Sequence, residues 1–123
     1  MDDRILVLAC GSRDWCDYDK IDDALDQAGF KDHPDKLRLV HGGAAGADRM
    51  AGEYAEQCGA EVVVCYADWN KYGKQAGYLR NIQMLDMNPE LVIAFWDGQS
   101  RGTLHTITEA RKRNIETVVI THG

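Results

Sequence analysis

The sequence has no long apolar segment and no paired cysteine motif. Its longest apolar runs, 5–10 and 61–65, are the size of a strand, whereas a helix that spans a bilayer needs about 20 apolar residues. None of the four cysteines forms a C-x-x-C pair, so buried reduced thiols are favoured over a metal site or a disulfide framework. We therefore expect neither a membrane partner nor a bound metal of structural importance.

Positive charge is also scarce. The chain carries 20 acidic against 14 basic residues, a formal net charge of -6 at pH 7. This balance argues against binding to duplex DNA or an anionic membrane, so we expect no nucleic-acid partner unless a local basic patch exists. The chain begins MDDR and runs directly into an apolar pattern, without the features of a signal peptide, which favours a cytoplasmic location.

The length and the hydrophobic pattern predict one domain, 1–123, with a core of its own. Apolar and β-branched runs predict five strands, at 4–10, 37–41, 61–65, 91–95 and 117–120. Helical spacing predicts four helices, at 18–28, 47–58, 78–87 and 103–113, and a long loop at 66–77. Because strands alternate with helices, we predict an α/β fold, a Rossmann-like three-layer sandwich with a five-stranded parallel sheet, in the order 3-2-1-4-5.

The segments that follow strands hold most of the unusual residues. They are GSRDW at 11–15, HGGAAGAD at 41–48, ADWNKYGK at 67–74 and WDGQSRGT at 96–103. In an open α/β sheet, ligands bind outside the carboxyl ends of the strands, near the point where the strand order reverses. Glycine, tryptophan, serine and arginine therefore gather at the edge where a ligand would bind.

The segment HGGAAGAD leads from a strand into a helix and is typical of a phosphate-binding turn. Small residues let backbone amides approach an anion, and the helix N-terminus adds a favourable dipole. The segment matches neither the G-x-G-x-x-G fingerprint nor a Walker A loop. A tight turn that needs glycine only for its backbone geometry is the alternative. Its candidate ligand contacts are His41, Gly42, Gly43, Gly46 and Asp48.

The segment WDGQSRGT repeats this design at the start of the last predicted helix. Hydroxyl and amide donors there could bind a second polar part of the same ligand. The candidate contacts are Asp97, Gly98, Ser100, Gly102 and Thr103. Two adjacent helix N-termini of this kind predict a small ligand with a phosphate and a further polar part, bound with micromolar affinity.

Basic residues concentrate in and beside these segments despite the net negative charge. The guanidinium groups of Arg80 and Arg13 suit phosphate oxygens, and Lys74 offers a further cation. Ordinary surface salt bridges are the alternative for the remaining cations. The basic residues concerned are Arg13, Arg49, Lys71, Lys74, Arg80 and Arg101.

Aspartate and aromatic residues accompany the same segments. One aspartate could bind a ribose hydroxyl or hold Mg²⁺ beside a phosphate, and no other cofactor is suggested. Asp48 could instead support the N-terminus of its own helix. Trp69 could stack on a base or pack between loops, and His41 and His105 are candidate acid–base groups.

Five motifs together resemble the YspA-type domain of the SLOG superfamily over nearly the whole chain. They are GSRDW at 11–15, HGGAAGAD at 41–48, ADW and YGK at 67–74, RN at 80–81, and AFWDG at 94–98 with GT at 102–103. The resemblance implies a Rossmann-like protein that binds a nucleotide or an ADP-ribose-like ligand, as a sensor or carrier. It adds Gly11, Ser12 and Asn81 to the predicted contacts. It also suggests a homo-oligomer, with candidate subunit contacts at Ile82, Leu85 and Met87.

Relatives in that superfamily include the Lonely Guy phosphoribohydrolases and the DNA-processing protein DprA. Lonely Guy enzymes carry P-G-G-x-G-T-x-x-E and an upstream arginine, to which Gly102, Thr103 and Arg80 are similar. Thr106 stands where their glutamate would be, and a threonine cannot supply a carboxylate. An N-glycosidic hydrolase of nucleoside monophosphates is therefore the alternative function. Its candidate catalytic residues are Arg80, which would position the phosphate or sugar, and Asp97, Asp14 or Glu109 in place of the glutamate. Single-stranded DNA binding, as in DprA, is disfavoured by the acidic charge balance.

Overall fold

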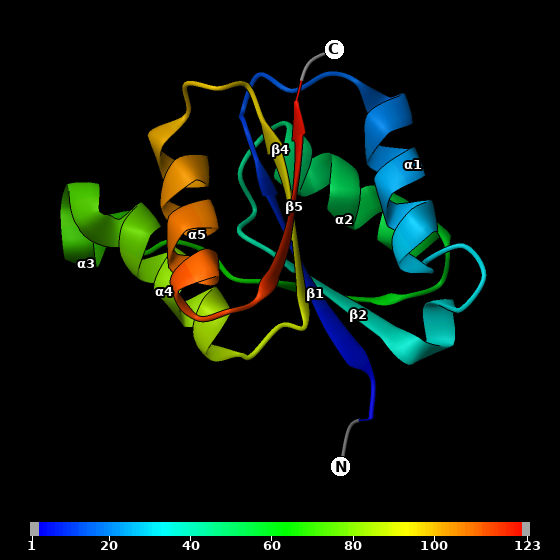
Figure 1. Ribbon diagram of the computed structural model, residues 1–123. Helices are drawn as coiled ribbons and strands as arrows, with labels where there is room; N and C mark the ends of the chain where they lie inside the picture. Colours follow the sequence, from blue (N-terminus) through cyan, green and yellow to red (C-terminus); the bar gives the residue numbers. More distant parts are fainter. Residues whose placement is uncertain (1–2, 122–123) are drawn as a thin grey trace.

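Five parallel strands form one sheet in the order β3-β2-β1-β4-β5 in the computed structural model, which describes residues 3–121 (Figure 1). The strands are β1 (Ile5–Gly11), β2 (Leu37–His41), β3 (Glu61–Val64), β4 (Leu91–Trp96) and β5 (Glu116–Thr121). Leu8 in the central strand pairs with Val40 on one side and Val92 on the other. The predicted fold class and strand order are confirmed. Both chain ends of the predicted domain, including Met1 and Asp2 of the signal-peptide argument, lie outside the described residues.

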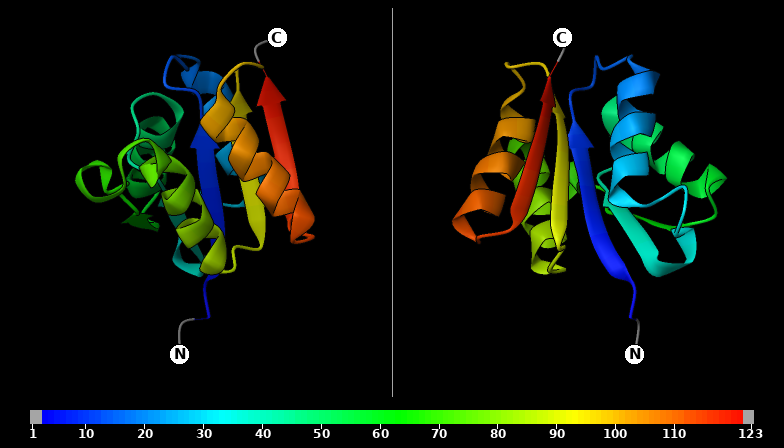
Figure 2. Two further views of the ribbon diagram at one scale, coloured as in Figure 1. Left: turned by 90° about the vertical axis from the view of Figure 1, so that its left-hand side faces the viewer. Right: turned by 45° about the vertical axis from the view of Figure 1, so that its right-hand side comes forward.

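Helices cover both faces of the sheet (Figure 2). One face packs against α1 (Tyr18–Ala28) and α2 (Ala47–Gln57), and the other against α4 (Ala76–Asp86) and α5 (Arg101–Lys112). Strand β1 is buried from Leu6 to Cys10, which explains its continuous apolar run. Helix α1 begins where the Asp17 side chain accepts from the Lys20 amide, and it ends at Gly29.

The segment predicted as a long loop contains two short helical turns. After β3 the chain forms α3 (Trp69–Tyr72) and a 3-10 turn (Gly73–Gln75), and α4 then begins at Ala76. The Asp68 carboxylate accepts from the Lys71 amide at 3.1 Å and starts α3, and Gly73 ends it. A single turn is too short to show helical periodicity, so the sequence pattern could not predict it.

Helix α4 corrects one of the predicted subunit contacts. Leu85 is fully buried against the sheet, because it belongs to the core between α4, α5 and the strands. Ile82 is half-buried and Met87 is exposed. Leu85 therefore serves the fold of its own chain. No helix within residues 3–121 combines the length and the apolar character needed to cross a membrane.

Candidate functional site

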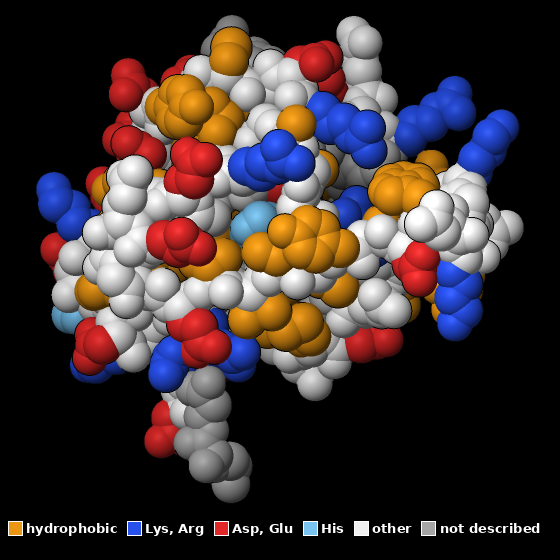
Figure 3. Space-filling view, turned by 180° about the vertical axis from the view of Figure 1, so that it is seen from behind, with side chains coloured by type: hydrophobic (Ala, Val, Ile, Leu, Met, Phe, Trp, Pro, Cys, Tyr) orange, Lys and Arg blue, Asp and Glu red, His pale blue; other side chains and the backbone are white. Residues whose placement is uncertain are grey.

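A pocket of about 460 Å³ opens at the carboxyl ends of β1 and β4, where the strand order reverses. Its walls come from the loops after these strands, from α4 and from the start of α5. Figure 3 shows Lys and Arg side chains gathered around a hollow on this face of the molecule. The position and size are those of a small-molecule site in an α/β protein.

Most of the predicted ligand contacts meet in this pocket. Those that line it are Gly11, Arg13, Asp48, Trp69, Lys74, Arg80, Asn81, Asp97, Ser100, Gly102 and Thr103. The predicted site residues that do not line it are Ser12, His41, Gly42, Gly43, Gly46, Gly98 and Glu109. Four segments far apart in sequence are thus brought to one hollow.

The glycine-rich loop between β2 and α2 uses its own amides internally. The buried Asp48 carboxylate accepts from the Gly42 amide at 3.0 Å and the Ala44 amide at 3.4 Å. The Gly43 amide donates to Nδ1 of His41 at 3.0 Å. These amides are therefore not available to an outside anion, and this loop is a tight turn stabilised by Asp48.

The same loop contacts Arg80, one of the basic residues that line the pocket. Nη1 of Arg80 donates to the Gly42 carbonyl at 2.6 Å, and Nε donates to Oδ1 of Asn81 at 3.1 Å. A Cβ atom at Gly42 would lie 2.7 Å from Cζ of Arg80. A side chain at this position would displace the guanidinium group, which lies directly against the backbone.

The start of α5 forms the wall opposite Arg80. Ser100 caps the helix by accepting from the Thr103 amide at 3.4 Å, and Oδ1 of Asp97 accepts from the Ser100 amide at 2.8 Å. The first amides of a helix have no acceptor within it, and Gly102, whose amide is one of them, lines the pocket. Asn81 links the two walls, because its Nδ2 donates to the Gly102 carbonyl at 3.2 Å.

Ser12 forms hydrogen bonds to the end of β4, to the loop that follows it and to the start of α2. Its amide donates to the Phe95 carbonyl at 2.9 Å, and its hydroxyl accepts from the Asp97 amide at 3.0 Å. Its own carbonyl accepts from the Ala47 amide at 3.2 Å. Ser12 is thus buried among β1, β4 and α2, where it holds these loops together without lining the pocket itself.

Of the candidate hydrolase residues, Arg80 and Asp97 line the pocket, whereas Glu109 does not. Thr106 lines it, but its hydroxyl donates to the Gly102 carbonyl at 3.3 Å within α5. Oε1 of Glu109 lies 3.6 Å from Nζ of Lys112 and outside the pocket. Glu109 is therefore not placed to act on a ligand in this pocket, whereas Asp14 and Asp97 line it. Hydrogen bonds from the Ser100 and Gln99 amides lower the pKa of Asp97.

Burial sets the charge of the two ionisable groups of the glycine-rich loop. Burial, with Arg80 and Arg49 nearby, lowers the pKa of His41 to about 4, so this histidine is neutral at pH 7. Burial raises the pKa of Asp48 to about 6, although Arg80 and backbone amides oppose the shift. Asp48 is therefore ionised at neutral pH but close to its titration range.

The pKa of Asp48 predicts a pH-dependent contribution to stability. Because the folded carboxyl group keeps its proton to about pH 6, whereas the unfolded one loses it near pH 4, stability from this group is lost as pH rises through that window. We expect the free energy of unfolding of the wild type minus that of Asp48→Asn to fall by about 2 kcal/mol between these limits. Urea unfolding at several pH values measures this difference. A difference that does not vary with pH would contradict the shift.

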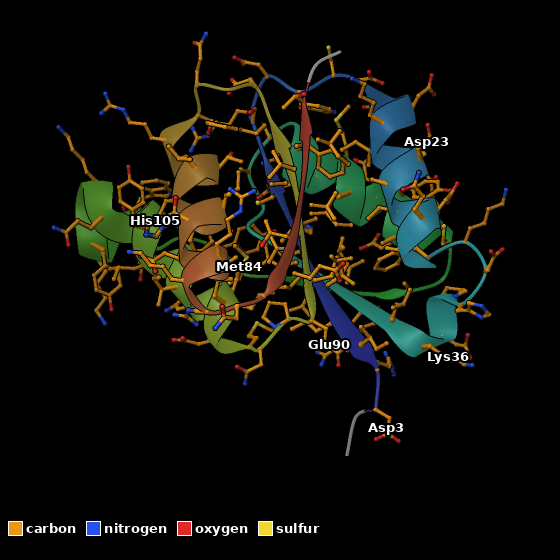
Figure 4. All side chains as sticks on the ribbon, in the orientation of Figure 1. Asp3, Asp23, Lys36, Met84, Glu90 and His105 are labelled. Carbon is orange, nitrogen blue, oxygen red and sulfur yellow. The ribbon has the colours of Figure 1, made fainter. Side chains whose placement is uncertain are left out.

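Sequence reasoning missed several lining residues, three of which, Gly77, Tyr78 and Met84, lie on α4. Gly77 and Met84 share the helical face of Arg80, and the i, i+3 and i+7 spacing from Gly77 could have predicted this for Met84. Figure 4 labels Met84 and His105 on the α4–α5 side of the sheet. Cys10, at the end of β1, also lines the pocket, and burial raises the pKa of its thiol. Tyr78 packs edge-on against His105.

No metal centre is assembled from the described side chains. Within residues 3–121, no three His, Cys, Asp or Glu side chains group in a way that could hold a metal ion. Mg²⁺ held by one aspartate beside a ligand phosphate stays a prediction.

These features define a Rossmann-like α/β protein with a pocket at the switch point of its sheet. A model of the YspA, cpYpsA-related SLOG family (YAcAr) matches residues 5–72. The chain belongs to this family, which confirms the resemblance seen in its motifs. It is also 41% identical over 117 residues to Gene 61 protein of Mycobacterium phage D29, covering 91% of this chain and 93% of that protein.

Two solved structures share the fold. The DNA processing protein A (DprA) of Streptococcus pneumoniae superposes with a TM-score of 0.75 at 19% identity, over 98% of this chain and 51% of that one. The Helicobacter pylori protein superposes with a TM-score of 0.71 at 17% identity, over 96% of this chain and 66% of that one. The chain thus spans between half and two thirds of the DprA chains that it matches.

The second comparison corrects the expectation that nucleic acid is not a partner. The Helicobacter pylori structure is described by its single-stranded DNA binding mode, so this fold does accommodate nucleic acid. The expectation rested on the net charge of the whole chain. Net charge is a poor guide here, because cationic side chains gather locally around the pocket (Figure 3).

Proposed function

We propose that the pocket binds a nucleotide or a nucleotide-derived ligand through its phosphate, and that the protein acts as a sensor or carrier of that ligand. The observation that carries the proposal is the convergence of two anion-binding features on one hollow. The guanidinium group of Arg80 lies in one wall, and the first turn of α5, with the Gly102 amide, forms another. A phosphate between them would accept hydrogen bonds from both.

Other lining residues suit the rest of a nucleotide. Trp69 is 50% exposed at the mouth of the pocket and offers a face for base stacking. Arg13 and Lys74 line the same pocket and add positive charge for further phosphate oxygens. Asp97, with its lowered pKa, is ionised at neutral pH, so its carboxylate can accept a hydrogen bond from a ribose hydroxyl. This set requires no catalytic carboxylate.

Isothermal titration calorimetry with adenosine 5′-monophosphate and with adenosine tests the proposal. We expect micromolar binding of the monophosphate and much weaker binding of the nucleoside, because the phosphate provides the charge-assisted hydrogen bonds. Equal affinities for the two compounds would overturn the phosphate-centred proposal. Chromatography of the same mixtures for free adenine, against a heat-killed control, tests the alternative hydrolase.

Gly102 offers a variant that changes the pocket without harming the fold. It lies in the first turn of α5, and a Cβ there would have no atom within 4 Å. We expect Gly102→Ala to raise the free energy of unfolding by about 0.5 kcal/mol, because alanine favours a helix. We also expect binding of adenosine 5′-monophosphate to weaken by about tenfold, because the methyl group occupies the space beside the first amides of the helix. Thermal unfolding and calorimetry measure the two effects, and unchanged affinity would place the phosphate elsewhere.

Single-stranded nucleic acid is the second candidate ligand. Two observations favour it: the fold shared with the Helicobacter pylori protein, and the exposed aromatic side chains Tyr66, Trp69, Tyr72 and Tyr78. Aromatic rings and cations along a groove are the usual means of binding single strands. Fluorescence anisotropy of a labelled single-stranded oligonucleotide at low salt tests this candidate, and a flat titration would exclude it.

A further inference from the structure

A conspicuously exposed aromatic side chain lies just outside the pocket. Tyr66 follows β3 and is 73% exposed, the largest fraction among the exposed large hydrophobic side chains of residues 3–121. Its ring lies against the glycine-rich loop, because a Cβ at Gly43 would lie 2.6 Å from Cε1 of Tyr66. One side of the ring therefore faces the loop, while much of its surface faces solvent.

A cation lies on the same glycine. Nε of Arg49 donates to the Gly43 carbonyl at 3.2 Å, and the side chain is exposed. The ion pairs found within residues 3–121 do not include Arg49. Its remaining guanidinium donors thus have no carboxylate partner in the described part of the chain.

Tyr66 and Arg49 both lie next to the part of the glycine-rich loop that contacts Arg80. Gly43 stands between Gly42, whose carbonyl holds Arg80, and Ala44, which lines the pocket. A ligand that fills the pocket and continues across this loop would meet Arg49 and Tyr66 next. Lys and Arg side chains lie beside hydrophobic ones on the face shown in Figure 3.

We infer that Tyr66 and Arg49 form a second subsite, which takes an aromatic base joined through a phosphate to the nucleotide in the pocket. The inference rests on the proposed function of the pocket. Arg49 binds the linking phosphate, and the ring of Tyr66 stacks on the second base. The ligand is therefore a dinucleotide or a longer strand, and the free mononucleotide occupies only part of the site.

The test compares three adenosine compounds by calorimetry with the whole protein. They are adenosine 5′-monophosphate, the 5′-phosphorylated dinucleotide with a 3′–5′ phosphodiester, and diadenosine pyrophosphate. We expect at least one dinucleotide to bind about tenfold more tightly than the monophosphate, since one stacked base and one phosphate contact are added. A gain for the phosphodiester compound indicates a nucleic-acid strand as the ligand, and a gain for diadenosine pyrophosphate indicates a pyrophosphate-linked dinucleotide.

Variants then assign the gain to the two side chains. Tyr66→Ala and Arg49→Ala should each reduce the gain severalfold and leave affinity for the monophosphate unchanged, whereas Tyr66→Phe should keep the gain. Tyr18, on α1, is also exposed, so Tyr18→Ala is the matched control and should leave the affinity for all three compounds unchanged.

The outcomes separate this inference from the proposed function. Binding of the monophosphate with no gain for either dinucleotide, or a gain that survives both alanine variants, overturns the subsite and leaves the pocket proposal standing. Failure of all three compounds to bind overturns both. A lower mass by light scattering for Tyr66→Ala than for the wild type would mean that Tyr66 contacts a second copy of the chain, which also overturns the subsite.

Discussion

Replacing Arg80 with alanine should weaken binding of adenosine 5′-monophosphate by about 10- to 100-fold, the largest effect expected of any pocket side chain. A hydrogen bond to a charged group contributes about 1.5–3 kcal/mol, which corresponds to this range. The guanidinium group already donates to the Gly42 carbonyl and to Oδ1 of Asn81, so it is oriented before a ligand arrives. Calorimetry measures the loss directly.

Two further variants test whether the contribution of Arg80 to affinity depends on its geometry as well as its charge. Arg80→Lys keeps the positive charge but lacks the planar fork, so we expect it to recover only part of the affinity. Arg111→Ala removes an exposed arginine in the last turn of α5, outside the pocket, and should leave affinity unchanged. Full affinity in Arg80→Ala, with the circular dichroism spectrum of the wild type, would place the phosphate away from Arg80.

Replacing Gly46 with alanine should lower the free energy of unfolding by about 3 kcal/mol or more. Gly46 has φ 77° and ψ -127°, a conformation that side-chain-bearing residues avoid. A Cβ there would also lie 2.5 Å from the carbonyl oxygen of Ser12. That carbonyl cannot move freely, because it accepts from the Ala47 and Trp15 amides. Urea unfolding measures the loss.

Gly59 separates the two causes of that loss. It also has a positive φ, 93°, but a Cβ there would have no atom within 4 Å. Gly59→Ala should therefore cost only the conformational part, about 1 kcal/mol. Similar losses at both positions would mean that the contact with the Ser12 carbonyl has no energetic weight.

The fold was accessible from the sequence because its elements are strongly patterned. The run at 91–95 is apolar throughout because β4 is buried on both faces, and the helix predicted at 18–28 has clear end signals in Asp17 and Gly29. The segments that line the pocket could be predicted because parallel strands bring their carboxyl ends to one edge. The single turn of α3 was missed because four residues are too few for a periodic signal.

The role of the glycine-rich loop could not be predicted from its spacing. Small residues before a helix indicate that something approaches the backbone closely, but not what approaches. Here the side chain of Asp48 returns to the Gly42 amide, and Arg80, 38 positions along the chain, reaches the Gly42 carbonyl. Both contacts depend on tertiary structure. Gly102 shows the converse, because the space beside it is free for a ligand.

Charge is distributed unevenly over the molecule, because α1 carries a cluster of acidic side chains. Asp19, Asp22, Asp23 and Asp26 lie on this helix, and Figure 4 labels Asp23 across the sheet from the α4–α5 side. Burial, and then repulsion from the other three carboxylates, raises the pKa of Asp22. An anion that drifts towards α1 is repelled, whereas one that nears Arg13 or Lys74 is attracted. An approaching anion is therefore directed towards the cationic side of the molecule, and added salt weakens this preference by screening both forces.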